Sequence, residues 1–324
     1  MDSKLNERKS AVNQHSERPS IPAISAYLTL FGAQLAVGAA AIFARFALHG
    51  AGPLVVAALR LTIAGLPLLV LSWPKSRGLA IPRNHELLFA VSGIALAVHF
   101  ATWIGSLLYT SVAVSTLLVS TSPVWTSLYD VVVLKQRFKR AFWFALPACG
   151  CGVILIAAAH SSVAPVVGFE WFGNLLALLG SVGFAGYLIA IRSVSHTYPT
   201  IVIVGRTYSW SAVTLSITAI FAKQMPPAND VMSWAGILAM AFISQILGHT
   251  GMNACLRWFS PSTVAFSTLL EPVFAAILAC LIFSEKLSAQ TLFGSALVLA
   301  SLAVILQNQP ETTQQQTAAS GNEL

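Results

Sequence analysis

The chain has 324 residues, of which 56% are hydrophobic and only 9% are charged. Soluble domains carry about 25% charged residues, so a chain this apolar cannot cover itself with polar surface, and lipid must be part of its solvent. The formal net charge of +7 does not indicate a nucleic-acid partner. The basic residues lie in short segments between apolar runs, which is typical of membrane topology.

Two polar segments flank the apolar part of the chain. Residues 1–24 are charged and lack the early apolar core of a signal peptide, so they are predicted to form a disordered leader. Residues 307–324 are rich in Gln, Thr and Ala and are predicted to form a disordered tail. The apolar runs between them have the roughly 20 residues that a helix needs to cross a bilayer. The predicted spans are 25–47, 53–73, 85–107, 111–134, 141–159, 168–191, 200–221, 231–254, 262–284 and 288–306.

An even number of spans places both termini on one side of the membrane. When that side is taken as the inside, thirteen Lys and Arg residues lie in the inner segments, and only Lys223 and Lys286 lie in the outer loops. Basic residues accumulate in cytoplasmic loops, so both termini are predicted to be cytoplasmic. Asp130, near the inner end of the fourth span, could pair with an inner basic residue.

The two halves of the chain echo each other. Residues 25–159 and 160–306 are therefore predicted to form two five-helix repeats. Because five is odd, the halves insert in opposite orientation, which suits alternating access. The predicted fold class is an all-α polytopic membrane protein, with ten transmembrane helices as two inverted five-helix repeats. The repeated features are Pro53 seven residues before Arg60 and Pro199 seven before Arg206, Ser-Thr-Leu-Leu at 115–118 and 267–270, and the prolines Pro123 and Pro272 that follow.

Over about residues 25–307, these features resemble the drug/metabolite transporter (DMT) superfamily in its ten-helix, EamA-type branch. The specific features are the repeat, the step from Glu271 to Pro272, and Ser-Glu-Lys-Leu at 284–287 before the last span. The first half departs from the family pattern, with Gln136 where an acidic residue is usual. It also has Ser122 at the position of Glu271.

The resemblance implies export or exchange of small metabolites, often amino acids, through a central cavity lined by helices one to four and six to nine. It also favours a bacterial inner membrane as the location.

Polar side chains spaced four residues apart share one face of a helix. Lipid would penalise such faces, so they are expected to turn inward and line a cavity or a hydrogen-bonded core. The predicted cavity residues are His99, Trp103, Gln245, His249, Asn253, Ser267 and Glu271.

Charged residues within the spans need a partner or a function, because each costs about 2.5–3.5 kcal/mol near the bilayer centre. Glu271 could bind a proton or a substrate amine, or it could form a structural ion pair. Arg60 and Arg206 could each hold a substrate carboxylate, or each could form an ion pair or reach towards the membrane surface. His99 and His249 could contact substrate or carry protons, or they could simply pack.

Pro123 and Pro272 fall inside predicted helices, where proline removes a backbone hydrogen bond and can kink the helix. They are interpreted either as gating kinks or as static kinks that shape the packing.

The chain has neither a glycine-rich phosphate loop nor paired metal ligands on one helix, so no cofactor and no enzyme activity are expected. The predicted function is a secondary transporter that exports small metabolites such as amino acids by alternating access, with proton coupling as a possibility. The alternative is an exchanger or uptake transporter for organic anions or sugar derivatives. An intramembrane enzyme or a scaffold is less favoured. The expected partners are a small-molecule substrate and the lipid bilayer, without nucleic acid, and the oligomeric state stays open.

Overall fold

The structure is a computed structural model that describes residues 24–77, 79–158, 166, 168–192, 194, 197–255 and 267–307. Within these residues the regular elements are all helices, and the prediction of an all-helical fold is confirmed. The predicted leader and tail, apart from their inner end residues, and the predicted boundary between the repeats lie outside the described residues. The helices are α2 (Ile24–Gly38), α3 (Ala40–Ala47), α4 (Pro53–Ser76), α5 (Arg83–Ser106), α6 (Val112–Val119), α7 (Ser122–Val132), α8 (Arg140–Ala157), α9 (Glu170–Arg192), α10 (Thr200–Phe221), α11 (Val231–Ala239), the π-helix η1 (Met240–His249), α12 (Thr250–Cys255), α14 (Leu270–Phe283) and α15 (Ala289–Gln307).

Several of these helices have the length and apolar composition of membrane spans. Five segments are long and apolar enough to cross a membrane, namely Ile24–Ala47, Pro53–Ser76, Arg83–Ser106, Glu170–Arg192 and Val231–Met252. Three shorter apolar helices are Arg140–Ile156, Leu270–Phe283 and Ala289–Ile305.

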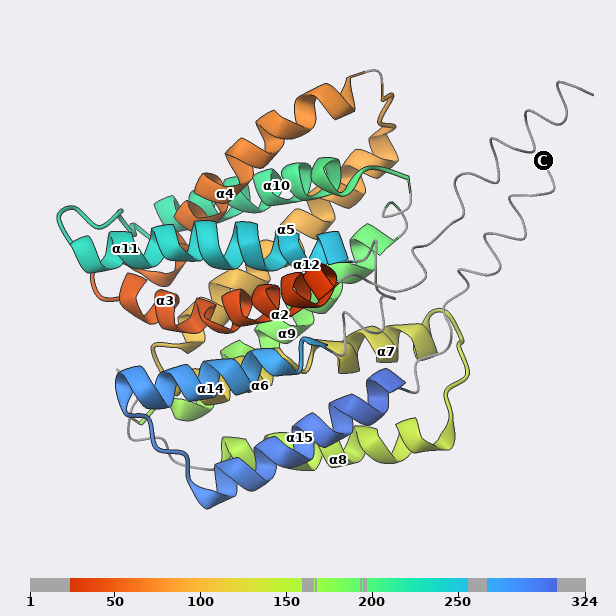
Figure 1. Cartoon of the computed structure of the whole chain (residues 1–324), viewed down its shortest axis with the longest axis vertical. Helices are drawn as coiled ribbons and strands as arrows, with labels where there is room; N and C mark the ends of the chain where they lie inside the picture. The colour runs from red at the N-terminus through yellow and green to blue at the C-terminus, as the bar shows by residue number, and fades with distance from the viewer. Residues whose placement is uncertain are drawn as a thin grey trace, which may run out of the picture.

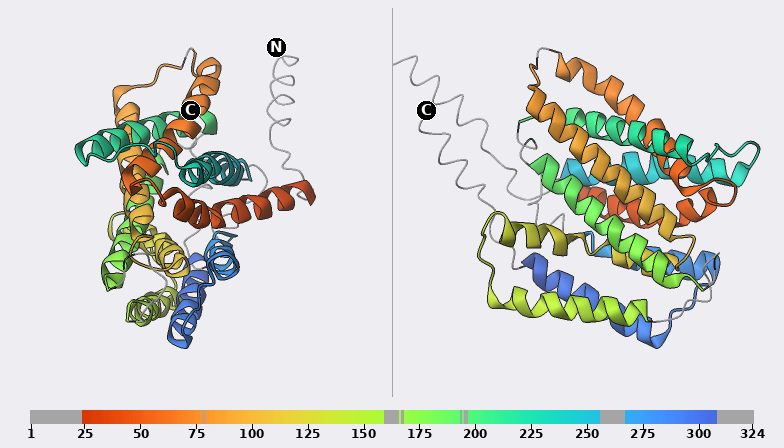
Figure 2. Two further views of the ribbon diagram at one scale, coloured as in Figure 1. Left: turned by 90° about the vertical axis from the view of Figure 1, so that its left-hand side faces the viewer. Right: turned by 180° about the vertical axis from the view of Figure 1, so that it is seen from behind.

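The chain passes back and forth along one direction, with α2 and α3 forming one pass and α11, η1 and α12 another (Figure 1). At one edge of the bundle α4 packs against α10, and at the opposite edge α8 packs against α15 (Figures 1 and 2). Between these edges α5 packs against α9, while α11 and η1 pack against α3 and α2. The start of α2 and the end of α15 lie at the same end of the bundle (Figure 1).

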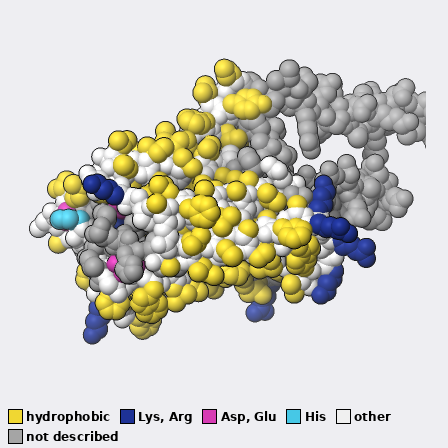
Figure 3. Space-filling model, turned by 90° about the horizontal axis from the view of Figure 1, so that it is seen from below, with side chains coloured by type: hydrophobic (Ala, Val, Ile, Leu, Met, Phe, Trp, Pro, Cys, Tyr) yellow, Lys and Arg dark blue, Asp and Glu magenta, His cyan; other side chains and the backbone are white. Residues whose placement is uncertain are grey.

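The distribution of polar and apolar side chains is the reverse of that in a soluble protein. Phe144 is 76% exposed and Leu281 is 75% exposed, whereas Gln34 and Arg60 are fully buried. Hydrophobic side chains cover the middle of the face shown in Figure 3, and Lys and Arg gather towards its ends. An apolar exterior of this extent is suited to lipid rather than to water.

Pro123 and Pro272, the prolines that recur in the two halves, do not lie inside continuous helices, and this part of the prediction is wrong. Helix α6 ends at Val119 and α7 begins at Ser122, so Pro123 lies in the first turn of a new helix. Pro272 likewise lies in the first turn of α14. Proline is tolerated there because the N–H that it lacks would have no partner within the helix.

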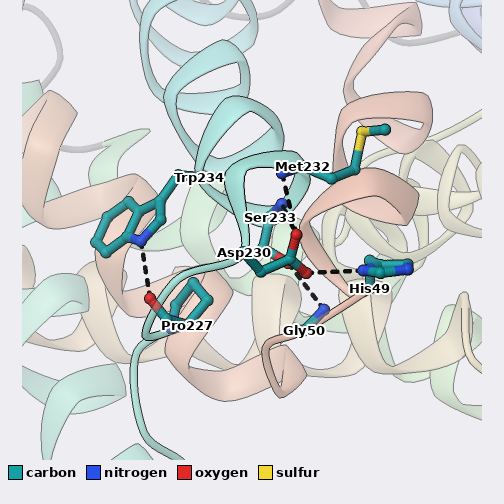
Figure 4. Close-up of polar contacts among 7 residues, drawn as sticks. All are labelled: His49, Gly50, Pro227, Asp230, Met232, Ser233 and Trp234. Carbon is teal, nitrogen blue, oxygen red and sulfur yellow. Dashed lines mark hydrogen bonds and ion pairs between the residues drawn. The ribbon is translucent and has the colours of Figure 1, made fainter.

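At one end of the bundle, the loop between α3 and α4 is fastened to the start of α11 (Figure 4). Asp230 caps α11 by accepting a hydrogen bond from the Met232 nitrogen at 3.0 Å. Its Oδ2 lies 2.7 Å from His49 Nδ1 and accepts a bond from Ser233 Oγ at 2.9 Å. The same Ser233 Oγ accepts a bond from the Gly50 nitrogen at 2.8 Å. These contacts, here called the Asp230 clasp, tie together two segments about 180 residues apart.

The Asp230 clasp makes a prediction about pH. Hydrogen bonds from His49 and then from Ser233 lower the pKa of Asp230 from its ordinary value of 3.8 to about 2. A carboxylate with a lowered folded-state pKa contributes stability above its unfolded pKa and loses it as the pH falls through the folded pKa. Asp230→Asn should therefore lower the melting temperature in detergent at pH 7, and the deficit should shrink between about pH 4 and pH 2. Asparagine is also a good helix cap, so the comparison keeps the cap and removes the charge together with one acceptor oxygen, the one that His49 and Ser233 Oγ contact. A deficit that is the same at every pH would contradict this account.

Candidate substrate-binding site

A pocket with a cavity volume of about 80 Å³ lies between the helices of the bundle. Of the residues predicted from sequence, it brings together Arg60, His99, Trp103, His249 and Glu271. The full lining is Val37, Ala40, Arg60, His99, Phe100, Trp103, Thr116, Val119, Ser120, Ser122, Phe184, His249, Met252, Thr268 and Glu271.

Arg60 projects from α4 and is 0% exposed. Its Nε donates a hydrogen bond to Gln245 Oε1 at 3.0 Å, and its Cζ lies 4.2 Å from the centre of the Phe100 ring. The two remaining nitrogens, Nη1 and Nη2, are buried and have no hydrogen-bond partner within the described part of the chain. The guanidinium is thus held at Nε by Gln245 and on one face by Phe100, while the donors on Nη1 and Nη2 are unused.

His99 belongs to an aromatic wall formed by α5 and α9. Its Nδ1 lies 2.9 Å from the Gly180 carbonyl oxygen. Its ring is parallel to that of Trp103, and the two ring centres are 6.1 Å apart. The Phe184 ring lies 5.0 Å from it. The close approach of the two helices requires Gly183, because a Cβ there would lie 2.8 Å from the His99 backbone nitrogen. The ring of His99 is therefore oriented by packing and by a backbone carbonyl.

Glu271 lines the pocket from the first turn of α14. Within the described residues no hydrogen bond or ion pair to its carboxylate is found, and it does not pair with Arg60 or Arg206. Ser267, predicted to lie on the same face, instead accepts a hydrogen bond from Gln34 Nε2 at 2.7 Å and does not line the pocket.

The predicted stripe of Gln245, His249 and Asn253 assumed α-helical spacing, but Met240–His249 is a π-helix. A π-helix has more residues per turn and occurs often at functional sites. His249 reaches the pocket, while Gln245 is 1% exposed and holds Arg60 instead of lining the pocket. The side chain of Asn253 lies outside the described residues.

Arg206 does not line the pocket. Its Nη1 forms an ion pair with Glu86 of α5, which also accepts a hydrogen bond from Trp210 Nε1 at 3.0 Å. The Arg206 and Glu86 side chains are 31% and 35% exposed. This arginine therefore belongs to a partly exposed ion pair, and it is Arg60 that lines the pocket.

Two further ion pairs join the first half of the chain to the second. Arg45 of α3 lies 3.6 Å from Glu285, and Arg192 of α9 lies 2.6 Å from Asp130 of α7. Glu285 also accepts a hydrogen bond from the Val112 nitrogen at the start of α6. The Arg45–Glu285 pair is the more buried, with side chains 10% and 2% exposed against 37% and 11%.

Sequence reasoning missed much of the apolar lining. Phe184 and Met252 lie on helices where one phenylalanine or methionine among many apolar residues carries no distinguishing signal. Gly180 and Gly183, spaced one turn apart, could have indicated the crossing that positions Phe184 and His99. No group of three His, Cys, Asp or Glu side chains in the described residues could hold a metal ion.

The ion pairs can be ranked by mutation, because Glu285 and Glu86 each hold one arginine and one further donor. Glu285→Gln should lower the free energy of unfolding by about 3 kcal/mol, because removing one partner leaves a buried charge unpaired. Glu86→Gln should lower it by about 1 kcal/mol or less, because pairs that are only partly buried contribute little. Denaturant titration of both variants in one detergent would measure the difference. Equal losses would show that burial does not set the strength of these pairs.

Comparison with known proteins adds to this geometry. A transporter of Bacillus subtilis, YwfM, is 26% identical over 267 residues, covering 79% of this chain and 85% of its own. A protein of Pseudomonas aeruginosa named as the pseudopaline exporter CntI is 26% identical over 240 residues, covering 72% of this chain and 79% of its own. One solved crystal structure shares the fold, with a TM-score of 0.58 and 19% identity, over 94% of this chain and all of that one.

The family model described as the EamA-like transporter family matches the chain twice, over residues 24–158 and again over 171–307. The resemblance to EamA-type members of the DMT superfamily is thereby confirmed. The chain belongs to the EamA-like transporter family of membrane proteins.

Proposed function

We propose that this protein is a secondary transporter, and that it exports small amphipathic metabolites, such as amino acids, by alternating access. The observation that carries the proposal is the composition of the pocket. Its lining includes a buried cation at Arg60, a carboxylate at Glu271, and the aromatic side chains of His99, Phe100, Trp103 and Phe184. An amino acid has the complementary groups, namely a carboxylate, an amine and an apolar body. The relative named as a pseudopaline exporter supports export of a small molecule.

We also propose ten membrane spans in two inverted repeats at residues 25–159 and 160–306, with both termini in the cytoplasm of a bacterium. The packing supports this arrangement, because its helix pairs occur in matched sets. The contact of α5 with α9 corresponds to the contact of α11 and η1 with α3 and α2. Three further contacts each join a helix of the first half to its equivalent in the second half, namely α4 with α10, α6 with α14, and α8 with α15. Such symmetry lets each half open one side of the membrane.

The two ion pairs between the halves are proposed to close the two ends of the pathway. Arg45 lies in the last turn of α3 and Arg192 in the last turn of α9, and these helix ends lie at opposite ends of the bundle (Figure 1). Opening one end would separate one pair while the other stays formed. Pro123 and Pro272, at the starts of α7 and α14, are the proposed points of flexure.

The unused donors of Arg60 also favour a second candidate function, the exchange or uptake of organic anions. Net efflux and exchange can be told apart in liposomes, because an obligatory exchanger moves labelled substrate only when unlabelled substrate is present on the other side.

Proteoliposomes that contain the full chain test the proposed function. Labelled amino acids loaded inside should leave faster than from protein-free liposomes, and a pH gradient should change the rate if protons are coupled. If the protein transports neither amino acids nor organic anions under either condition, the proposal is wrong.

His99→Ala and Glu271→Gln should each lower the efflux rate by about tenfold or more while expression stays near that of the parent, because both side chains line the pocket. The matched controls are His85→Ala and Glu170→Gln. His85 forms a hydrogen bond with Tyr198, and Glu170 is the first residue of α9. Neither side chain lines the pocket. If the pocket variants transport like the parent, the site assignment is wrong. If Glu271→Gln does not fold, Glu271 is structural.

A further inference from the structure

The arginines of the bundle differ in their partners. Arg45, Arg192 and Arg206 each have a carboxylate within ion-pair distance. Arg60 is more buried than any of them, at 0% exposure, and within the described residues it has no carboxylate partner. A charge in so apolar an environment is retained only when something satisfies it, so an external anion is the expected partner.

The geometry of Arg60 selects the shape of that anion. A guanidinium has five N–H donors, and the one on Nε is taken by Gln245. One face of the group is covered by Phe100. The two nitrogens that remain, Nη1 and Nη2, form the planar fork that binds the two oxygens of a carboxylate side by side.

A second unused donor belongs to a neighbouring side chain of the same pocket. Trp103 lines the same pocket, and its ring centre lies 5.8 Å from Arg60 Cζ. The indole Nε1 is buried and has no hydrogen-bond partner within the described ranges. Indole nitrogen can only donate, so it adds to a set of donors that suits an acceptor-only group. The stacked ring of His99 fixes the indole plane.

We infer that Arg60 and Trp103 form the carboxylate-binding end of the substrate pocket, and that the transported molecules are monocarboxylates with an apolar body. The carboxylate binds Nη1 and Nη2 of Arg60 through both oxygens, and Trp103 Nε1 donates to one of them. The apolar body lies against Val119, Phe184 and Met252 on other helices. This inference rests on the proposed transport function and specifies its substrate class.

Four related compounds separate the carboxylate from the amine. They are L-phenylalanine, which has both groups, 3-phenylpropionate, which lacks the amine, and L-phenylalaninamide and 2-phenylethylamine, which lack the carboxylate. Binding to the purified full chain in detergent is measured by competition with labelled phenylalanine. The two carboxylates should bind about ten- to a hundredfold more tightly than the two compounds without one, because charge-assisted hydrogen bonds would be lost.

Variants connect this preference to the two residues. Arg60→Gln should bring the ratio of carboxylate to amide affinity close to one, and Arg60→Lys should restore only part of it, since lysine keeps the charge but not the fork. Trp103→Phe should reduce the same ratio several-fold. Trp125→Phe is its control, because Trp125 Nε1 already donates to Ser181 Oγ at 2.7 Å and lies outside the pocket lining.

The ratio within each variant is the decisive quantity, because a purely structural defect weakens all four compounds together. An unchanged ratio in Arg60→Gln and Trp103→Phe overturns the inference. So does a parent protein that transports the amine and not the carboxylates, although it would leave the transporter function intact. If Arg60→Gln does not fold, the ratio in Trp103→Phe decides. If the parent transports none of these compounds nor any other metabolite tested, the proposed function itself fails.

Discussion

A charged side chain within an apolar bundle must be satisfied by another group, and the arrangement of this protein follows from how each charge meets that requirement. Arg206 is satisfied by Glu86 on a neighbouring helix, and Arg192 by Asp130 in the other half of the chain. The charge of Arg45 is paired with Glu285, and its Nη2 also donates to the Thr110 carbonyl. These pairs bring together helices that are distant in sequence. They also leave Arg60 distinct, since its neighbours hold the guanidinium without neutralising it.

The unequal chemistry of the two halves becomes understandable in the same terms. In the second half, Glu285 precedes the last helix and pairs with Arg45. The first half has Gln136 at the corresponding position, which cannot neutralise an arginine. Arg192, the counterpart of Arg45, reaches Asp130 instead, six residues earlier in the chain. The departure from the family pattern is therefore a change in where the carboxylate is placed, and both inter-half pairs are kept.

The parts of the site that sequence could predict are those that depend on local pattern. Four-residue spacing placed His99 and Trp103 on one face, and the cost of a buried charge singled out Arg60 and Glu271, all of which line the pocket. The rest depends on contacts between distant segments. No local pattern shows that Arg206 meets Glu86, 120 residues away, or that residues 240–249 widen into a π-helix that turns Gln245 towards Arg60. The break before Pro123 was missed because apolar composition does not record where one helix stops and the next begins.

The two inter-half ion pairs differ in burial, and on the proposed mechanism this difference has a consequence for kinetics. Separating the buried Arg45–Glu285 pair exposes two desolvated charges, whereas in the Arg192–Asp130 pair the arginine side chain is already 37% exposed. The empty carrier then spends unequal time facing the two sides. Apparent affinity falls in proportion to the fraction of molecules that are competent to bind. One and the same pocket would therefore saturate at different concentrations on the two faces of the membrane, without any change in the residues that line it.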